Sequence, residues 1–189
     1  INGGDHWIKL KGNVPIISFR DLAIQKRETD LIGASFGRSF YIFDDYSVLR
    51  ELSQKQMEAE GTLFSVRKAW WYIPRSHLGF GDRPKGTQGD SHFTAPNPPF
   101  GAVFTYHLSS DLQSKKDIRQ GREKTSNEKN NDVDFPGWDV VEAERRELGP
   151  KILMVVKDNN GNVIRRIDAP GKKGFHRVSW DLRYPSPMA

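Results

Sequence analysis

The segment GFHRVSWDLRY, residues 174–184, alternates between two sets of side chains, and this constrains the fold more than any other feature of the chain. The mainly apolar set consists of His176, Val178, Trp180 and Leu182. The other set consists of Phe175, Arg177, Ser179 and Asp181. Neighbouring side chains of a β-strand point to opposite faces, so the pattern predicts a strand with one buried face. We expect Trp180 to anchor the core beneath that face.

Three further segments of the C-terminal half are typical of strands: GAVFTYHLS (101–109), KILMVVKD (151–158) and VIRRIDAP (163–170). Asn160-Gly161, between the last two, is typical of a hairpin turn. Four short strands with Gly- and Pro-rich connections and a buried Trp predict a β-sandwich of immunoglobulin or fibronectin type over residues 100–189.

A polar excursion, residues 112–150, interrupts this predicted sandwich after its first strand. Its first part is mixed in charge, so we expect an exposed, partly helical segment. FPGWDVVEAERREL then predicts a short helix, with Asp139 as its cap and Val140 and Val141 packing back. We interpret the acidic residues interleaved with Arg145 and Arg146 as a solvated face: Glu142, Glu144, Glu147.

Residues 1–60 predict an antiparallel sheet followed by a helix. Runs of apolar residues at 6–10, 17–25, 30–37 and 39–45, separated by turn sequences, predict a four-stranded meander. Residues 44–56 then predict a helix with Asp45 or Ser47 as N-cap and Val48 on its buried side. The Asp44-Asp45 pair could be read as catalytic carboxylates, but adjacent acidic residues at a helix start are more often caps.

Residues 61–99 predict an aromatic strand followed by a long Pro- and Gly-rich loop. Trp70, Trp71 and Tyr72 could form a stacking platform for a sugar or a base. We prefer the interpretation that this run, which is apolar on both faces, is packed between two units. In this interpretation it joins or covers the N-terminal sheet.

Two groups of residues resemble metal sites, and neither has the required spacing. The long loop carries His77, Asp82, Asp90 and His92, without a tight pattern such as His-x-x-x-His. Asp158, Asn160 and Asn162 alternate as in a calcium loop, but Val163 stands at the position that needs Gly. We therefore predict no metal site and no cofactor.

Composition excludes several function classes. The 29 Lys and Arg residues against 24 Asp and Glu give a net charge of +5, and the charges are interspersed, so we expect no nucleic-acid partner. The absence of Cys excludes disulfides and thiol catalysis. No stretch reaches the roughly 18 to 20 apolar residues of a membrane span. The chain has no nucleophile elbow, phosphate loop or dinucleotide fingerprint.

The N-terminal INGGDHW resembles an Asp-box turn, Ser-x-Asp-x-Gly-x-x-Trp, with Asn2 in the Asp place, Gly4 in the Gly place and Trp7 in the Trp place. Asn2-Gly3-Gly4 also suits a tight turn, so the chain starts in the middle of a predicted hairpin. Over residues 1–53 and 97–185 the sequence resembles the C-terminal part of bacterial BNR-repeat (Asp-box) β-propeller proteins, sialidase-like and sortilin-like, often labelled glycosyl hydrolases. Segments that carry the resemblance include DLIGASFGRSFYIFDDYSVLREL, NPPFGAVFTYHL and FPGWDVVEAERREL.

This resemblance implies a mainly β chain, with a terminal propeller blade and capping helix over 1–60 and an immunoglobulin-like module after it. It implies a non-catalytic module of a larger protein that is secreted, periplasmic or at the cell surface. The partners would be upstream blades, with a protein or glycan ligand contacted through Trp70, Trp71, Tyr72 or Arg38. The alternative is a fragment of a sialidase-like glycoside hydrolase with its active centre upstream. Only Arg38, Tyr41 and Asp44 could contribute to such a centre, and they cannot complete it.

Overall fold

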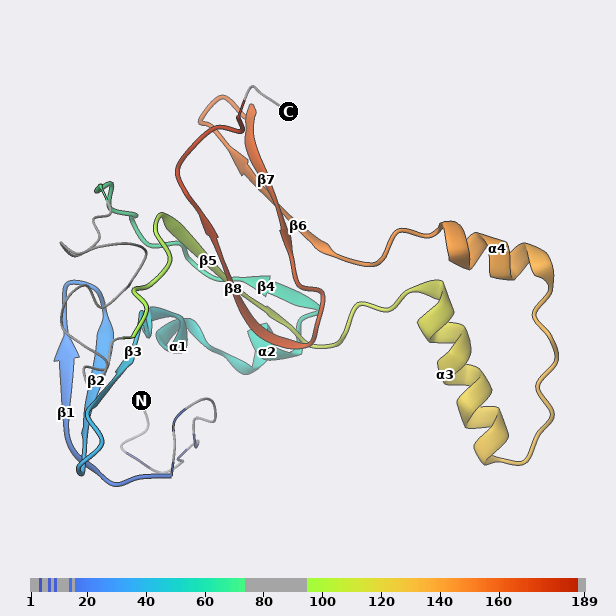
Figure 1. Cartoon of the computed structure of the whole chain (residues 1–189), viewed down its shortest axis with the longest axis horizontal. Coiled ribbons are helices and arrows are strands. Elements are labelled where there is room, and N and C mark those ends of the chain that lie inside the picture. Colours follow the sequence, from blue (N-terminus) through green and yellow to red (C-terminus); the bar gives the residue numbers. More distant parts are fainter. Residues whose placement is uncertain are drawn as a thin grey trace, which may run out of the picture. The chain divides into compact units, whose positions relative to one another are not determined.

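The computed structural model describes residues 4, 7, 9, 14, 16–73 and 95–186. The chain divides into two compact units, Ile1–Glu51 and Leu52–Ala189, which are considered separately (Figure 1). Strands hold 31% and helices 21% of the described residues, and every strand pair is antiparallel. The prediction of a mainly β chain is confirmed.

The first unit contains a three-stranded meander followed by one short helix. Its strands are β1 (Phe19–Gln25), β2 (Asp30–Ser35) and β3 (Phe40–Phe43), in the order β1-β2-β3. Three of the four predicted strands therefore form as expected. Of the predicted first strand only Trp7 and Lys9 are described, so that strand lies outside the described residues.

The predicted helix over 44–56 is two helices, α1 (Ser47–Glu51) and α2 (Gln54–Glu58). Ser53 causes the break, because its backbone is extended and its side chain accepts a hydrogen bond from the Gln56 amide, as an N-cap does. The boundary between the two units falls in this gap. Val48 of α1 is buried, as predicted.

The second unit contains two small sheets. One has the order β4-β5-β8, from β4 (Gly61–Leu63), β5 (Ala102–Leu108) and β8 (Gly174–Trp180). The other is a hairpin of β6 (Ile152–Lys157) and β7 (Val163–Ala169). The last four of these strands lie within the segments predicted from sequence. Gly101 enters β5 with a φ of 105°, and a Cβ there would lie 1.8 Å from the Trp180 carbonyl oxygen, so only glycine fits.

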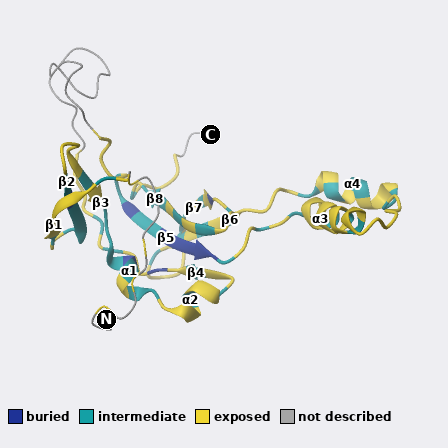
Figure 2. Ribbon diagram, turned by 90° about the horizontal axis from the view of Figure 1, so that it is seen from below, coloured by how far each residue is buried: buried dark blue, intermediate teal, exposed yellow. Residues whose placement is uncertain are grey.

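A small hydrophobic core joins the two sheets of this unit. Tyr106, Leu108 and Ala169 are buried in it, with partly buried neighbours Ile152, Met154 and Val178. The Tyr106 hydroxyl donates a hydrogen bond to the Pro170 carbonyl. Figure 2 shows that the buried residues of this unit gather along β5.

The prediction that Trp180 anchors the core is wrong. The alternation itself is confirmed, because His176, Val178 and Trp180 are the less exposed face of β8, whereas Phe175 and Arg177 are exposed. Trp180 is only half-buried, however, since it is the last residue of the strand. The core is centred on β5, whose neighbours β4 and β8 protect both of its edges.

Residues between β5 and β6 form a helical hairpin, α3 (Lys115–Glu128) and α4 (Trp138–Arg146). A capping box of Ser114 and Asp117 starts α3. The predicted cap of α4, Asp139, is wrong: the N-cap is Gly137, at a φ of 91°, and Asp139 lies in the first turn. Val141 packs back, whereas Val140 remains 44% exposed.

An ion pair that the sequence did not indicate links the two helices. Arg119 of α3 donates from Nε and Nη2 to the two carboxylate oxygens of Glu144 in α4, at 2.6 and 2.8 Å. The Glu144 side chain is only 5% exposed, and Glu147 accepts a hydrogen bond from the Lys115 amide. The prediction of a wholly solvated acidic face is therefore wrong for Glu144, because α3 supplies its partner. Arg119 holds the pKa of Glu144 below its ordinary value.

Candidate functional site

The residues that could serve a hydrolase centre lie apart within the first unit. Arg38 lies in the turn before β3, and Asp44 follows the last residue of the same strand. Each strand residue advances the chain by about 3.3 Å, so the four residues of β3 hold the backbones of the two residues apart, and no ion pair joins them among the described residues. Tyr41 packs edge-on against Phe19, with ring centroids 5.7 Å apart. The structure does not bring the three together.

Asp45 has the structural role that the sequence favoured. Its carboxylate accepts hydrogen bonds from the Ser47 hydroxyl at 2.6 Å and from the Ser47 amide at 3.2 Å, where α1 begins. Its own amide donates to the carboxylate of Asp30. The acidic pair thus begins at the end of β3, and its second member helps to start the helix.

The three consecutive aromatics of the second unit form an exposed group. Trp70, Trp71 and Tyr72 are 55%, 63% and 50% exposed, and residues 64–73 form no strand. The prediction that they lie in a strand is therefore wrong, whereas the prediction that they cover the N-terminal sheet stays a prediction, because that sheet belongs to the other unit. Only β4, at the start of the predicted segment, pairs with a neighbour.

Phe100, at the other end of the long loop, packs against two of these three aromatics. Its ring lies edge-on to Trp71, at 5.8 Å between centroids, and to Tyr72, at 4.9 Å. The Lys68 ammonium lies 5.7 Å from the Trp70 ring. Two aromatic rings fixed by a third, with half or more of each surface exposed, can stack against the apolar face of a sugar or a side chain. We call Trp71, Tyr72 and Phe100 the aromatic platform.

A buried histidine is the titratable group that sequence reasoning missed. His107 is 4% exposed, its Nδ1 has no hydrogen-bond partner among the described residues, and its ring lies 4.8 Å from that of Phe175. Burial lowers the pKa of His107, and Lys173 and His176 lower it further. The sequence feature that could have indicated its burial is its position inside the apolar strand segment 101–109. The imidazole is therefore neutral at neutral pH and packs as part of the sheet.

Other predicted site residues have structural roles or lie outside the described part of the chain. Gly4 has a φ of 97° and Trp7 is 89% exposed, while Asn2 is not described, so the Asp-box stays a prediction. His77, His92 and their acidic neighbours also lie outside the described residues. Both carboxylate oxygens of Asp158 accept hydrogen bonds from its own hairpin turn, which lowers its pKa.

Within the described ranges, no three His, Asp or Glu side chains are grouped so that they could hold a metal ion. No described helix is both long and apolar enough to cross a membrane. Comparisons of the chain with known protein families, with curated proteins and with solved structures find no match.

Proposed function

We propose that this chain is a non-catalytic module whose first unit packs, as a propeller blade does, between neighbouring sheets of a larger exported protein. The observation that carries the proposal is the composition of the β1-β2-β3 sheet, which is apolar on both faces. Register places Leu22, Ile24 and Phe43 on one face and Ile32, Phe40 and Ile42 on the other.

All of these side chains except the partly buried Ile32 are largely uncovered. Leu22 and Ile24 are 63% and 54% exposed on the first face, and Phe40 and Ile42 are 69% and 60% exposed on the second. A single sheet that faced water on one side would alternate apolar and polar residues, whereas a sheet covered on both sides is apolar throughout. The pattern therefore supports sheets on both sides, which is the arrangement of blades in a propeller.

The second unit would provide the contact surface of the module. The aromatic platform offers rigid, half-exposed rings, which suit contact with a protein or a glycan. A pair of small sheets around one core supports an immunoglobulin-like sandwich as the scaffold of this surface.

Lysine substitutions on each sheet face test the proposal. We expect Leu22→Lys and Phe40→Lys to lower the fluorescence of a dye that binds exposed apolar surface, each with little change in thermal stability, because neither side chain is buried. Lys26→Gln, in the exposed turn between β1 and β2, is the control. A large loss of stability in both lysine variants, with no change in dye binding, would show that the faces are already covered within the chain.

A further inference from the structure

The α3–α4 hairpin carries a pair of largely exposed aromatic rings, Phe135 and Trp138, which we call the knob. Phe135 and Trp138 pack edge-on with ring centroids 5.2 Å apart, yet they are 61% and 79% exposed. Gly137, at a φ of 91°, and Pro136 turn the chain between them, so the geometry of the pair is set before any partner arrives. Exposed, pre-organised Trp and Phe side chains are typical anchors of protein interfaces.

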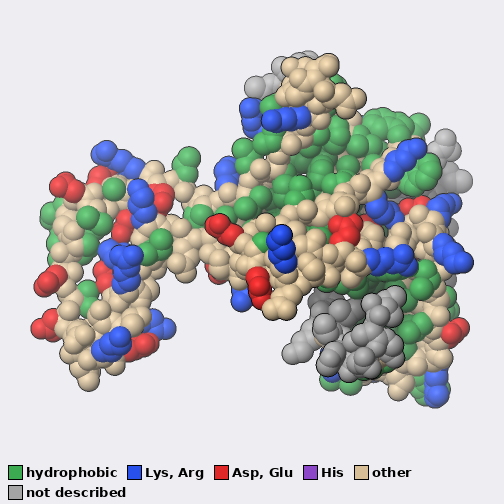
Figure 3. Space-filling view, turned by 180° about the vertical axis from the view of Figure 1, so that it is seen from behind, with side chains coloured by type: hydrophobic (Ala, Val, Ile, Leu, Met, Phe, Trp, Pro, Cys, Tyr) green, Lys and Arg blue, Asp and Glu red, His purple; other side chains and the backbone are tan. Residues whose placement is uncertain are grey.

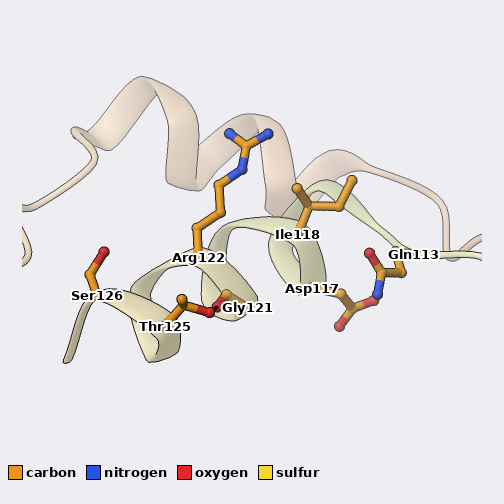
Figure 4. Close-up of a pocket in the computed structure, with 7 residues that line it drawn as sticks. All are labelled: Gln113, Asp117, Ile118, Gly121, Arg122, Thr125 and Ser126. Carbon is orange, nitrogen blue, oxygen red and sulfur yellow. Dashed lines mark hydrogen bonds between the residues drawn. The ribbon is translucent and has the colours of Figure 1, made fainter. Parts of the chain in front are cut away.

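A shallow hollow lies on α3 of the same hairpin (Figure 4). Gly121 is one of its lining residues, and a side chain at this position would extend into open space, because nothing lies within 4 Å of where a Cβ would be. Ile118, which is 40% exposed, and Arg122 line the hollow together with Thr125, whose hydroxyl donates to the Gly121 carbonyl. Arg119 and Glu123, which pair with each other, do not line it. The hollow is thus open to a partner while the ion pair to α4 stays intact.

The helix that carries the hollow and the segment that carries the knob differ in charge. The α3 segment 115–129 has six basic and three acidic residues, and the α4 segment 132–147 has six acidic and two basic ones. The hollow is lined by one basic residue, Arg122, and by Asp117, whose carboxylate is held by the Ser114 amide and hydroxyl. Five charged side chains lie around the two surfaces: Asp132, Asp134 and Asp139 flank the knob, Arg122 lines the hollow and Lys124 lies beside it. None of these five side chains has an ion-pair partner among the described residues. Figure 3 shows both signs of charge on this hairpin.

We propose that two copies of this chain pair through their hairpins, with the Phe135–Trp138 knob of each copy seated in the Gly121 hollow of the other. A two-fold arrangement makes both contacts at once, because each copy offers the same knob and the same hollow. Two antiparallel helix pairs then form a four-helix assembly, with the acidic flank of each knob against the basic α3 of its partner.

The mass in solution tests this pairing. Sedimentation velocity of the whole chain should show a species of twice the 21.6 kDa monomer mass. Raising the salt concentration from about 50 mM to about 500 mM should weaken the dimer, because the charges are exposed. The double variant Phe135→Ala/Trp138→Ala and the variant Gly121→Gln should each raise the dissociation constant about tenfold or more. Tyr184→Ala, which removes an aromatic that is 72% exposed elsewhere, should leave it unchanged.

Cross-linking provides a measurement that does not depend on the stability of those variants. Since the chain has no cysteine, Asp139→Cys and Thr125→Cys introduce single labels beside the knob and the hollow. A short bis-maleimide should join a mixture of the two variants more efficiently than either variant alone. A chain that is monomeric at every concentration, a dimer unaffected by the knob and hollow variants, or cross-links no more frequent in the mixture would each overturn the proposal.

Discussion

At the scale of single residues, burial determines which side chains matter for stability. Leu108 is 4% exposed in the core of the second unit, whereas Trp180 is half-buried at the end of its strand. We expect Leu108→Ala to cost about 2 to 5 kcal/mol of unfolding free energy. Trp180→Ala should cost less, because Trp180 is only partly buried and is not a member of the core cluster. Urea unfolding of the two variants measures both values, and a larger cost for Trp180→Ala would contradict the assignment of the core to β5.

The second residue-scale prediction concerns acid sensitivity at His107. Its folded-state pKa lies below the ordinary value of 6.5, so the unfolded chain binds the proton more readily than the folded chain. The stability linked to this group is therefore complete above about pH 6.5 and declines as the pH falls below that value. Melting temperatures measured from neutral to mildly acidic pH should show the decline, and His107→Leu should reduce it. An identical pH profile in that variant would assign the effect to other groups.

At the scale of elements, the Arg119–Glu144 pair holds the helical hairpin. We expect Glu144→Gln to increase backbone exchange in α3 and α4, because it removes the charge that accepts both guanidinium hydrogen bonds. Glu142→Gln is the matched control, since that carboxylate is 44% exposed and its ion pairs among the described residues lie within α4. The wild-type hairpin should loosen in acid as the pH falls through the lowered pKa of Glu144. Equal exchange in the two variants would mean that apolar contacts alone hold the helices.

The sequence predicted elements well where local pattern determines them. Period-two alternation found β8, and Asn160-Gly161 marked the turn between β6 and β7, where Gly161 has a φ of 85°. Predictions from the sequence failed where the environment of a side chain depends on a residue distant in the chain. Glu144 looked solvated because Arg119 lies on another helix, and the Trp70–Tyr72 run looked packed because exposure depends on what surrounds it.

For the molecule as a whole, we expect no enzymatic activity of the isolated chain. Catalysis needs several groups that converge on one pocket, and the candidate residues Arg38, Tyr41 and Asp44 do not converge. Purified chain should turn over no sialoside, aryl glycoside, ester or peptide above background, with or without divalent metal ions. Turnover that Asp44→Asn or Arg38→Ala abolishes would place an active site at this sheet.

The β1-β2-β3 sheet carries largely exposed apolar side chains on both faces, and amide hydrogen exchange measures how well its strands are protected. β2 and β5 are matched, since each is the middle strand of a three-stranded antiparallel sheet. The two strands differ in how many of their residues are buried: β5 contains five buried residues, whereas in β2 only Gly33 is buried. Amides of β5 should therefore exchange at least about tenfold more slowly than those of β2 in the isolated chain. Equal protection of the two strands would contradict this expectation, because it would show that the first sheet is already stabilised from both sides.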